Sequence, residues 1–395
     1  MRALLLTRDF PPDGGGIARA LGEVARHAPV GSLTVCTGRQ PGSAAFDADC
    51  ATPVVRVGVA GDRLRTLPGL ARWAWRAGRL ARDADFLWAG NVKPAGHVAR
   101  WVGRRRGIPY GLIVYGLDLQ LLARQSAADP ARRRRAAALL WDAAGTVAIS
   151  RWTASRFTAL AEDLGVADAA RHLRVVTPGV DAARFRPGTA TPALRARYGL
   201  DDRPWLLTVA RLMPHKGIDT GLEVLRALHA EGYAAGYAVA GAGPDAERLR
   251  RKAVDLGVAA HVRWLGQVPD VDLPGLYGAA AVYLGLSRRE GDEVEGFGLS
   301  LLEAQACGLP VVAGREGGTE DAVTHGVTGF LVETITEVAA VRAVADLLAD
   351  RSRRRVLGAA ARARAEREFG WPRVVRELEA AATAFRGGRG ARDGR

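Results

Sequence analysis

Residues 282–314 read VYLGLSRREGDEVEGFGLSLLEAQACGLPVVAG, and the fold class can be inferred from this stretch. The apolar runs at 282–286 and 310–313 have the length and composition of buried strands. Between them, apolar side chains recur at helical spacing until Gly308 and Pro310, which together end a helix. A strand, a helix and a second strand in this order predict a βαβ unit and hence a parallel sheet.

The same alternation extends along the whole chain. In the first half we expect strands at 3–7, 33–37, 54–57, 86–89, 111–114, 146–149 and 174–176. In the second half we expect them at 205–209, 237–240, 262–265, 282–286, 310–313 and 329–332. Because turn-forming pairs such as Pro187-Gly188 interrupt the pattern between the two series, it predicts an α/β fold of two Rossmann-like lobes that face each other across a cleft.

The length of 395 residues suits this division, since a domain usually holds roughly 100–200 residues. We place the first lobe at 1–186 and the second at 187–371. A helix at about 372–385 is expected to pack back on the first lobe. The low-complexity tail at 386–395 is expected to be disordered.

The net charge of +14 is concentrated in the first lobe. Residues 1–180 hold 26 lysines and arginines against 14 acids, whereas residues 181–395 hold 30 against 28. The excess of +12 predicts a polyanion, an anionic membrane or a phosphorylated substrate as the partner of this lobe. GC-rich coding is the alternative explanation, because Lys93, Lys216 and Lys252 are the only lysines among the 56 basic residues.

The three cysteines, Cys36, Cys50 and Cys307, are widely spaced and lack any CxxC or Cys/His pattern. This spacing argues against a disulfide framework and against a zinc site, and it favours a reducing cytoplasm as the compartment. No apolar run approaches the roughly 18 residues that span a bilayer. We therefore expect any membrane contact to be peripheral, at the inner face of the plasma membrane.

Two strand-to-helix loops carry groups suited to bind phosphate. After the strand at 3–7, Gly15 and Gly16 allow the backbone to approach an anion closely, although a tight turn explains them equally well. In the second lobe, Arg211 and Lys216 leave one loop and can clamp a diphosphate. Because lysine is so scarce in this chain, Lys216 indicates a chemical requirement rather than a solvated surface cation.

The helix of the opening stretch is expected to begin at Phe297–Gly298, where its free N–H groups and positive dipole end can face a ligand. Glu295 stands just ahead of this end and can reach a group above it. Glu303 lies inside the helix and can bind diol hydroxyls along its side. A plain surface helix with flanking carboxylates is the alternative, but Gly-Phe-Gly is poor helix-forming sequence and suggests another role.

In their order and spacing, these motifs resemble those of the retaining glycosyltransferases of family 4, which have the GT-B fold. The matching features are the glycine loop, Arg211 with Lys216, the turn Gly241-Ala242-Gly243-Pro244, the Glu-x7-Glu segment from Glu295 to Glu303, and Gly317-Gly318. They extend over almost the whole chain and are densest from Thr177 to Gly329. The form SRREGDEVEGFG followed by LLEAQACGLPVVAG is especially similar to actinobacterial mannosyltransferases that build phosphatidylinositol mannosides.

The resemblance implies transfer of a hexosyl group from a nucleotide diphosphate sugar, GDP-mannose or a UDP-sugar, to a hydroxyl of a glycolipid, a glycan or a small glycoside. The diphosphate is then expected to meet Arg211 and Lys216, with Gly15 and Gly16 near the donor phosphate. The rest of the donor is expected to meet Glu295 and the backbone of Phe297, Gly298 and Leu299 at the sugar, Glu303 at the ribose, and the backbone from Gly266 to Val268 at the base.

The first lobe is then the acceptor side and the second lobe binds the donor. Family members often carry a His-Gly pair at the end of a first-lobe strand, where this chain has Tyr115-Gly116. Tyr115 and Asp118 are expected on the sugar and acceptor side, together with Asn91 and Lys93, which follow the strand at 86–89. Because a tyrosine hydroxyl can still hydrogen-bond a sugar, we expect Tyr115 to alter donor or acceptor geometry rather than to abolish activity.

The resemblance further implies retention by front-face attack and no protein general base. We also expect neither a metal nor another cofactor. Asp-x-Asp triplets at 83–85 and 270–272 imitate a metal motif, but such triplets arise by chance among 42 acids. A nucleotide-sugar epimerase or hydrolase of the same fold, and a non-catalytic nucleotide-sugar binder, are the alternative functions. Nucleic acid is not an expected partner.

The segment 64–82, LRTLPGLARWAWRAGRLAR, places four apolar side chains on one helix face. They are Leu70, Trp73, Ala77 and Leu80. Such a face, with arginines around it, suits a helix that lies on an anionic membrane. A helix that covers the first sheet fits the same pattern, and we favour this second explanation.

Overall fold

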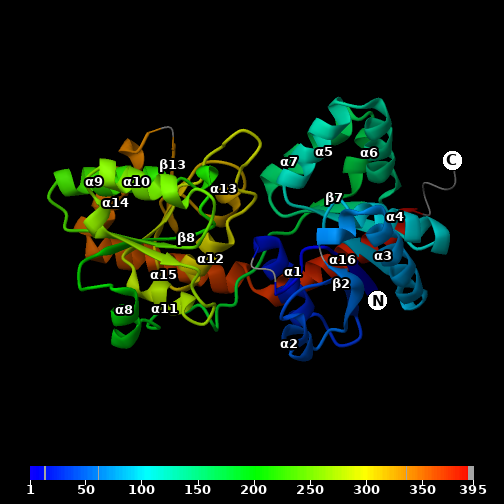
Figure 1. Ribbon diagram of the computed structural model, residues 1–395, viewed down its shortest axis with the longest axis horizontal. Helices are drawn as coiled ribbons and strands as arrows, with labels where there is room; N and C mark the ends of the chain where they lie inside the picture. The colour runs from blue at the N-terminus through cyan, green and yellow to red at the C-terminus, as the bar shows by residue number, and fades with distance from the viewer. Residues whose placement is uncertain (13–14, 61, 335, 390–395) are drawn as a thin grey trace. The chain divides into compact units, whose positions relative to one another are not determined.

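The computed structural model describes residues 1–12, 15–60, 62–334 and 336–389, which divide into two compact units (Figure 1). Unit 1 comprises Met1–Pro178 together with the segment that begins at Trp371. Unit 2 comprises Gly179–Gly370. The chain therefore leaves unit 1, completes unit 2 and then returns to unit 1.

Unit 1 is built on a seven-stranded parallel sheet with the strand order β3-β2-β1-β4-β5-β6-β7. Its strands are β1 (Ala3–Leu6), β2 (Leu33–Arg39), β3 (Val54–Ala60), β4 (Phe86–Ala89), β5 (Tyr110–Val114), β6 (Gly145–Ala148) and β7 (Leu173–Val175). Its helices are α1 (Gly16–His27), α2 (Ser43–Ala48), α3 (Leu67–Leu80), α4 (Ala95–Arg106), α5 (Leu117–Ala127), α6 (Pro130–Asp142), α7 (Arg151–Asp163) and α16 (Trp371–Arg389). Short 3₁₀ turns lie at Asp62–Arg65, Ala81–Asp83 and Ala167–His172.

Alternate residues of the central strands of unit 1 face opposite helical layers. Leu4 and Leu87 belong to a core that includes side chains of α3, α4 and α6. Leu5 and Trp88 face the other layer, formed by α1 and α16. Because both faces are covered, these strands are apolar along their whole length rather than at every second position. Phe385 of α16 adds an aromatic cluster on this second face, with its ring 6.2 Å from that of Trp88.

Unit 2 is built on a six-stranded parallel sheet with the order β10-β9-β8-β11-β12-β13. Its strands are β8 (Trp205–Val209), β9 (Gly236–Ala240), β10 (Val262–Gly266), β11 (Val282–Gly285), β12 (Val311–Gly314) and β13 (Gly329–Val332). Its helices are α8 (Pro192–Tyr198), α9 (Ile218–Ala230), α10 (Ala246–Asp255), α11 (Leu273–Ala279), α12 (Leu299–Ala306), α13 (Thr319–Ala322), α14 (Val338–Ala349) and α15 (Arg351–Glu368), with 3₁₀ turns at Pro214–Lys216 and Ala259–His261. Figure 1 shows α9, α10 and α14 on one face of this sheet and α8, α11 and α15 on the other.

Every predicted strand is present, with ends that differ from the prediction by three residues at most. The division between the units falls at Pro178–Gly179 rather than at 186–187. The reason is that residues after Pro178 bond to the end of unit 2: the N–H of Val180 donates to the carbonyl of Phe369 at 2.7 Å. At the carboxyl end, 386–389 belong to α16 instead of the predicted disordered tail, and 390–395 lie outside the described residues.

The amphipathic segment forms α3, and its apolar face covers the sheet of unit 1. Trp73 and Ala77 are fully buried, and the indole N–H of Trp73 donates to the carbonyl of Cys36 at 3.3 Å. Leu70 and Leu80 pack against the same core. The explanation that we favoured from the sequence is therefore confirmed, and this face is closed to a membrane. Within the described residues, no helix combines the length and the apolar character needed to cross a bilayer.

In each sheet the strand order reverses at one place, between β1 and β4 in unit 1 and between β8 and β11 in unit 2. Loops that leave neighbouring strands at such a reversal run in opposite directions, and ligands of open parallel sheets bind in the crevice between them. The loops after β1 and β4, and those after β8 and β11, therefore position several of the candidate functional residues.

Candidate functional site

In unit 2, the crevice between β8 and β11 brings Lys216 and Glu295 together. Lys216 ends the 3₁₀ turn after β8, and Glu295 lies on the loop 286–298 that joins β11 to α12. The Nζ atom of Lys216 lies 2.5 Å from Oε2 of Glu295, and Ser287 Oγ lies 3.5 Å from the same oxygen. A pocket at this place is lined by Thr208, Ala210, Lys216, Tyr283, Gly285, Ser287, Glu295, Ser300 and Leu301.

Two glycines allow the loops around this pocket to approach each other. Gly217 has a φ of +65°, and a Cβ there would lie 1.8 Å from the carbonyl oxygen of Leu286. Gly317 has a φ of +68°, and a Cβ there would lie 2.1 Å from the carbonyl oxygen of Glu295. Only glycine tolerates both the left-handed backbone and the contact. The backbone on either side of the Lys216–Glu295 pair is thus fixed by packing that excludes side chains.

The electrostatics of the pocket favour a charged pair. Burial alone would raise the pKa of Glu295, but the charge and hydrogen bond of Lys216, helped by His215 and Ser287, hold that pKa below its ordinary value. His215 is buried with Nδ1 2.7 Å from Oε2 of Glu293, and burial together with the Lys216 charge lowers the pKa of His215. At neutral pH the pocket therefore offers an ammonium for an anion and a carboxylate for hydroxyl groups.

The helix α12 begins where the sequence indicated. Gly298 is its N-cap residue with a φ of +95°, and Leu299 is the first helical residue. The N–H groups of the first helical turn have no partner within the helix, and they carry the positive end of its dipole. Phe297 does not line an open surface, because its buried ring packs 6.2 Å from that of Phe369. Phe297 can therefore offer a ligand only its backbone.

Glu303 is buried inside unit 2, 6% exposed, and its orientation is set by a tyrosine. The hydroxyl of Tyr277 donates to Oε2 of Glu303 at 2.7 Å. Tyr277 belongs to α11, a helix in which no candidate residue was expected from the sequence. A carboxylate held in this way is preorganised to accept further hydrogen bonds.

The other candidates of unit 2 also lie beyond the carboxyl ends of strands. Arg211 follows β8 by two residues and is exposed, and among the described residues no ion pair is recorded for it. Gly266 ends β10, and its carbonyl accepts from the N–H of Gly241 at 2.7 Å, with Val268 two residues further on. Because β9 lies between β10 and β8, Gly266 and Val268 stand two strands away from Lys216 along the same edge of the sheet.

The candidates of unit 1 lie at the matching reversal of its strand order or after the next strand, β5. Asn91, after β4, donates from Nδ2 to Oδ2 of Asp9, after β1, at 3.2 Å. Asp118, in the first turn of α5, accepts through Oδ1 from the backbone N–H groups of Tyr115 at 3.0 Å and Gly116 at 2.9 Å. Asn91 is thus joined to Asp9, which the sequence did not single out, across the reversal, and Tyr115 and Asp118 are joined to each other after the neighbouring strand β5.

Burial raises the pKa values of Asp118 and Tyr115. It raises the pKa of Asp118 to about 6, although backbone N–H groups pull the other way. Burial, then the charges of Asp118 and Asp9, raise the pKa of Tyr115 well above its ordinary value. Tyr115 is therefore a neutral hydrogen-bonding group, and Asp118 can carry a proton in mildly acidic solution.

Lys93 and the glycine loop complete the unit 1 candidates. Lys93 donates from Nζ to Oε1 of Gln125 at 2.8 Å, and burial followed by the charges of Arg132 and Arg135 lowers the pKa of Lys93. Gly15 is the N-cap residue of α1 and Gly16 is its first residue, and both are exposed. The predicted site residues thus form two groups, one in each unit.

Sequence reasoning missed several side chains that shape the unit 2 pocket. Ser300 accepts from the hydroxyl of Tyr283 at 2.7 Å, and Ser287 and the His215–Glu293 pair brace the loops beside it. Serine and histidine are too common at surfaces to stand out by type. Their only signal was position, since all of them lie in or next to loops that follow a strand.

The chain is similar in sequence to known glycosyltransferases. The family described as "Glycosyl transferases group 1" matches residues 191–364. A GDP-mannose-dependent alpha-(1-6)-phosphatidylinositol monomannoside mannosyltransferase from Mycolicibacterium smegmatis is 37% identical over 371 residues, which cover 91% of this chain and 92% of that protein. A protein of the same name from Mycobacterium tuberculosis is 35% identical over 390 residues, which cover 95% and 97%.

Solved structures resemble the chain in fold. HepE from Anabaena in complex with UDP and glucose has a TM-score of 0.78 at 20% identity, over 97% of this chain and 100% of that one. WaaG, a glycosyltransferase involved in lipopolysaccharide biosynthesis, has a TM-score of 0.65 at 18% identity, over 96% and 98%. The likeness extends over both units and confirms the predicted fold class.

Proposed function

The chain belongs to the group 1 glycosyl transferases and has the GT-B fold, and on this basis we propose that it transfers a mannosyl group from GDP-mannose to a phosphatidylinositol-based glycolipid with retention of configuration. The observation that carries the proposal is the Lys216–Glu295 pair in the pocket of unit 2. The names of two relatives that match almost the whole chain support the choice of donor and acceptor.

The proposed chemistry follows from the charges that develop during transfer. When the bond between the sugar and the diphosphate breaks, negative charge grows on the leaving phosphate. Lys216, Arg211 and the first N–H groups of α12 would stabilise that charge, which is the main electrostatic contribution expected in such a site. Glu295 would accept hydrogen bonds from hydroxyls of the sugar, and Glu303, oriented by Tyr277, would hold the ribose.

Retention is proposed to result from attack on the face that the leaving group vacates. The acceptor oxygen bonds to the anomeric carbon, the carbon–oxygen bond to the diphosphate breaks, and a phosphate oxygen of the leaving group takes the acceptor proton. This route needs no general base from the protein, and none is assigned. No metal is required either, since cationic side chains and a helix N-terminus would neutralise the diphosphate.

Unit 1 is proposed to bind the acceptor. Asn91 at the reversal of strand order, and Tyr115 and Asp118 after the next strand, would offer hydrogen-bonding groups for hydroxyls. Lys93 adds a cation, and the excess of +12 in residues 1–180 suits an acceptor that carries a phosphate. With Tyr115 in place of the histidine common in the family, a neutral hydroxyl would meet the sugar.

Contact with the inner face of the plasma membrane is proposed for the outer surface of α3 and α4, which we call the α3–α4 surface and define by Trp75, Arg79, Trp101 and Arg105. Trp75 and Trp101 are 60% and 48% exposed. The guanidinium groups of Arg79 and Arg105 lie over these two rings, 5.1 Å and 5.6 Å from their centres. Tryptophan and arginine together are favoured at the headgroup boundary of an anionic bilayer.

The membrane proposal is tested by sedimentation with vesicles of phosphatidylglycerol or of phosphatidylcholine. We expect binding to the anionic vesicles only, and a loss of at least fivefold in Trp75→Ser/Trp101→Ser. Val271→Ser, which changes an exposed residue of unit 2, is the control. Equal and negligible binding to both kinds of vesicle would contradict the membrane proposal and would favour GC-rich coding as the source of the net charge.

Transfer itself is tested with GDP-mannose and phosphatidylinositol monomannoside as substrates. Lys216→Ala and Glu295→Gln are expected to lower kcat/KM by at least ~100-fold, the usual effect of removing one such stabilising group. Lys252→Ala is the matched control, because its ammonium pairs with Glu223 in unit 2 and lines no part of the pocket. Full activity in both pocket variants would refute the proposal.

The same assay separates the alternatives. Release of free mannose or an isomerised sugar from the donor alone would identify a hydrolase or epimerase. Tight donor binding without turnover on any acceptor would identify a binding protein. Turnover of a UDP-sugar in place of GDP-mannose would keep the enzyme class and change the donor.

A further inference from the structure

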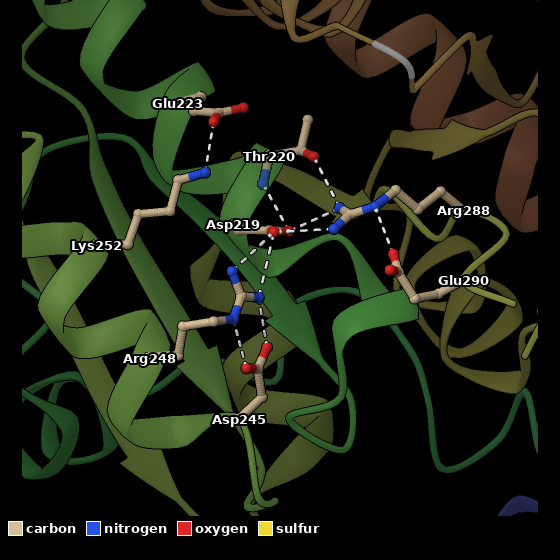
Figure 2. Close-up of polar contacts among 8 residues, drawn as sticks. All are labelled: Asp219, Thr220, Glu223, Asp245, Arg248, Lys252, Arg288 and Glu290. Atoms are coloured by element: carbon tan, nitrogen blue, oxygen red, sulfur yellow. Dashed lines mark hydrogen bonds and ion pairs between the residues drawn. The ribbon is translucent and has the colours of Figure 1, made fainter.

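Asp219 lies at the centre of an ion-pair network in unit 2 (Figure 2). Asp219 lies in the first turn of α9, and its side chain is 9% exposed. Two arginines form ion pairs with its carboxylate. Arg288 donates from its two terminal nitrogens, at 2.7 Å to Oδ1 and at 2.9 Å to Oδ2. Arg248, on α10, donates to Oδ2 at 3.2 Å and makes a second fork with Asp245 at 2.6 Å.

The two arginines come from different places. Arg248 belongs to a helix on the outside of the unit 2 sheet, whereas Arg288 belongs to the loop 286–298 that carries Glu295. Asp219 follows Lys216 by three residues in the chain. The Asp219–Arg288 pair therefore joins the segment that carries Lys216 to the loop that carries Glu295.

The same two segments are joined at the backbone. The N–H of Arg288 donates to the carbonyl of His215 at 2.9 Å, and His215 in turn pairs with Glu293 through Nδ1. The guanidinium of Arg288 also reaches Oγ1 of Thr220 at 3.2 Å. A planar fork with two parallel bonds fixes direction as well as distance, which a single-point contact does not.

Two arginines stabilise the charged form of Asp219. Burial would raise the pKa of Asp219, but the hydrogen bonds and charge of Arg288, followed by the charges of Arg248 and Lys252, hold it below the ordinary value. If either arginine is removed, the other still compensates the carboxylate of Asp219, so the severe cost of leaving this buried charge unpaired is avoided. The charge of Asp219 by itself therefore does not require both arginines.

We propose that the Asp219–Arg288 pair is a positioning element for glycosyl transfer. It holds the loop 286–298 so that Glu295 stays within hydrogen-bond distance of Lys216. The inference rests on the proposed function, because it assigns both side chains to the donor. A displacement of about 1 Å in a group that contacts a reacting substrate can cost roughly 100-fold in rate. Asp219 and Arg288 act through Glu295 and contact no substrate themselves.

Arg288→Met and Arg248→Met form a matched pair for the test. Each removes one guanidinium from Asp219 and keeps an unbranched side chain of similar volume. Arg248→Met also leaves Asp245, which is buried, without its fork, so it is expected to lower Tm at least as much as Arg288→Met. A purely structural role of the network would make the two variants alike in activity.

Three quantities are measured on the full chain: the kinetics with GDP-mannose and phosphatidylinositol monomannoside, the Kd for GDP, and amide hydrogen exchange in 287–298. For Arg288→Met we expect a fall in kcat of at least 30-fold, a Kd for GDP within threefold of the wild type, and exchange in 287–298 at least tenfold faster. Arg248→Met should stay within threefold of the wild type in all three. Arg288→Lys, which keeps the charge without the fork, should recover part of kcat, and it serves in place of Arg288→Met if that variant fails to fold.

Two results would overturn the inference. One is a kcat of Arg288→Met within threefold of the wild type. The other is an equal loss of kcat in Arg248→Met. A wild-type chain that transfers no sugar would instead count against the proposed function, and the exchange comparison would still decide whether Arg288 fixes the loop.

Discussion

The pKa values of two partly buried carboxylates, Glu295 and Asp118, are shifted in opposite directions because their neighbours differ. Glu295 has the ammonium of Lys216 at 2.5 Å, which outweighs burial and keeps the carboxylate charged. Asp118 is held by backbone N–H groups, and for it burial dominates. The sequence placed both residues in candidate sites, but it could not give the sign of either shift, because that sign depends on partners brought in by the fold.

Because its pKa is raised, Asp118 is predicted to lower the stability of the fold as the pH rises. Its folded-state pKa of about 6 lies above the ordinary 3.8, so the folded chain binds this proton more tightly than the unfolded chain. Stability contributed by Asp118 therefore falls as pH rises between these two values and stays low above them. Asp118→Asn cannot ionise, and we expect its Tm to exceed that of the wild type at about pH 8, with a difference that vanishes toward about pH 4.

Asp129→Asn is a control for which the expected pH dependence of stability has the opposite sign. The N–H of Ala131 at the start of α6 lowers the pKa of Asp129, so its ionised form stabilises the fold. This variant should melt below the wild type at about pH 8, with a difference that shrinks in acid. Parallel pH profiles for the two variants, measured by calorimetry, would contradict the assignment for Asp118.

Metal independence is a second prediction that concerns individual side chains. If Arg211 and Lys216 neutralise the diphosphate, activity should survive dialysis against EDTA and should not rise when Mg²⁺ or Mn²⁺ is added back. The rate with GDP-mannose is the measurement. A loss of more than tenfold that a divalent cation restores would require a metal-assisted route instead.

Helix α3 shows what periodicity can and cannot predict about an element. The spacing of Trp73 and Ala77 correctly gave an apolar face, and the choice between a membrane and the sheet was settled by burial under the core. The pattern said nothing of Trp75, which projects from the same helix with Arg79 over its ring. An exposed aromatic residue outside the apolar stripe carries no periodic signal, and so it is found only in the structure.

The two tryptophans of α3 should therefore differ sharply on substitution. Trp73→Ala removes a fully buried ring and is expected to lower the free energy of unfolding by about 3–5 kcal/mol. Trp75→Ala should change it by less than about 0.5 kcal/mol, as most surface substitutions do. Urea denaturation of both variants is the measurement, and a similar loss in the two would contradict the placement of α3.

Contacts between residues far apart in the sequence were the least predictable features of the structure. Asp219 and Arg288 are 69 residues apart, and neither lies in a motif whose chemistry points to the other. The strands, by contrast, were predicted throughout, because a strand buried on both faces is a continuous apolar run that can be read locally. The sequence thus predicted the scaffold and, in the pocket, Lys216 and Glu295, but neither Ser287 and Ser300 nor the ion pairs between distant segments.

At the level of the entire chain, unit 1 is completed by a helix that comes after unit 2 in sequence. Phe385 of α16 is 1% exposed, lies against Phe86 and Trp88, and sits where a Cβ at Gly145 would come within 2.3 Å of its ring. The predicted boundary at 186–187 was eight residues late, because turn-forming residues mark where a pattern stops rather than which unit a segment packs on.

Phe385→Ala should destabilise unit 1 selectively. We expect a loss of about 3–5 kcal/mol in that unit, seen as faster hydrogen exchange in β1 and β4 with little change in β8 and β11. Leu347→Ala, at a fully buried position of α14, is the control and should give the reverse pattern. Equal effects of each variant on both units would show that they unfold as one.

The insertion of unit 2 into unit 1 also sets the order in which the protein can be completed during translation. When the ribosome has delivered residues 179–370, unit 2 has all of its strands, whereas the sheet of unit 1 still lacks α16 over Leu5 and Trp88. The nascent chain therefore exposes an apolar sheet face for the time needed to make half of the protein. A chaperone that binds such a face would be needed most by the part of the chain that is synthesised first.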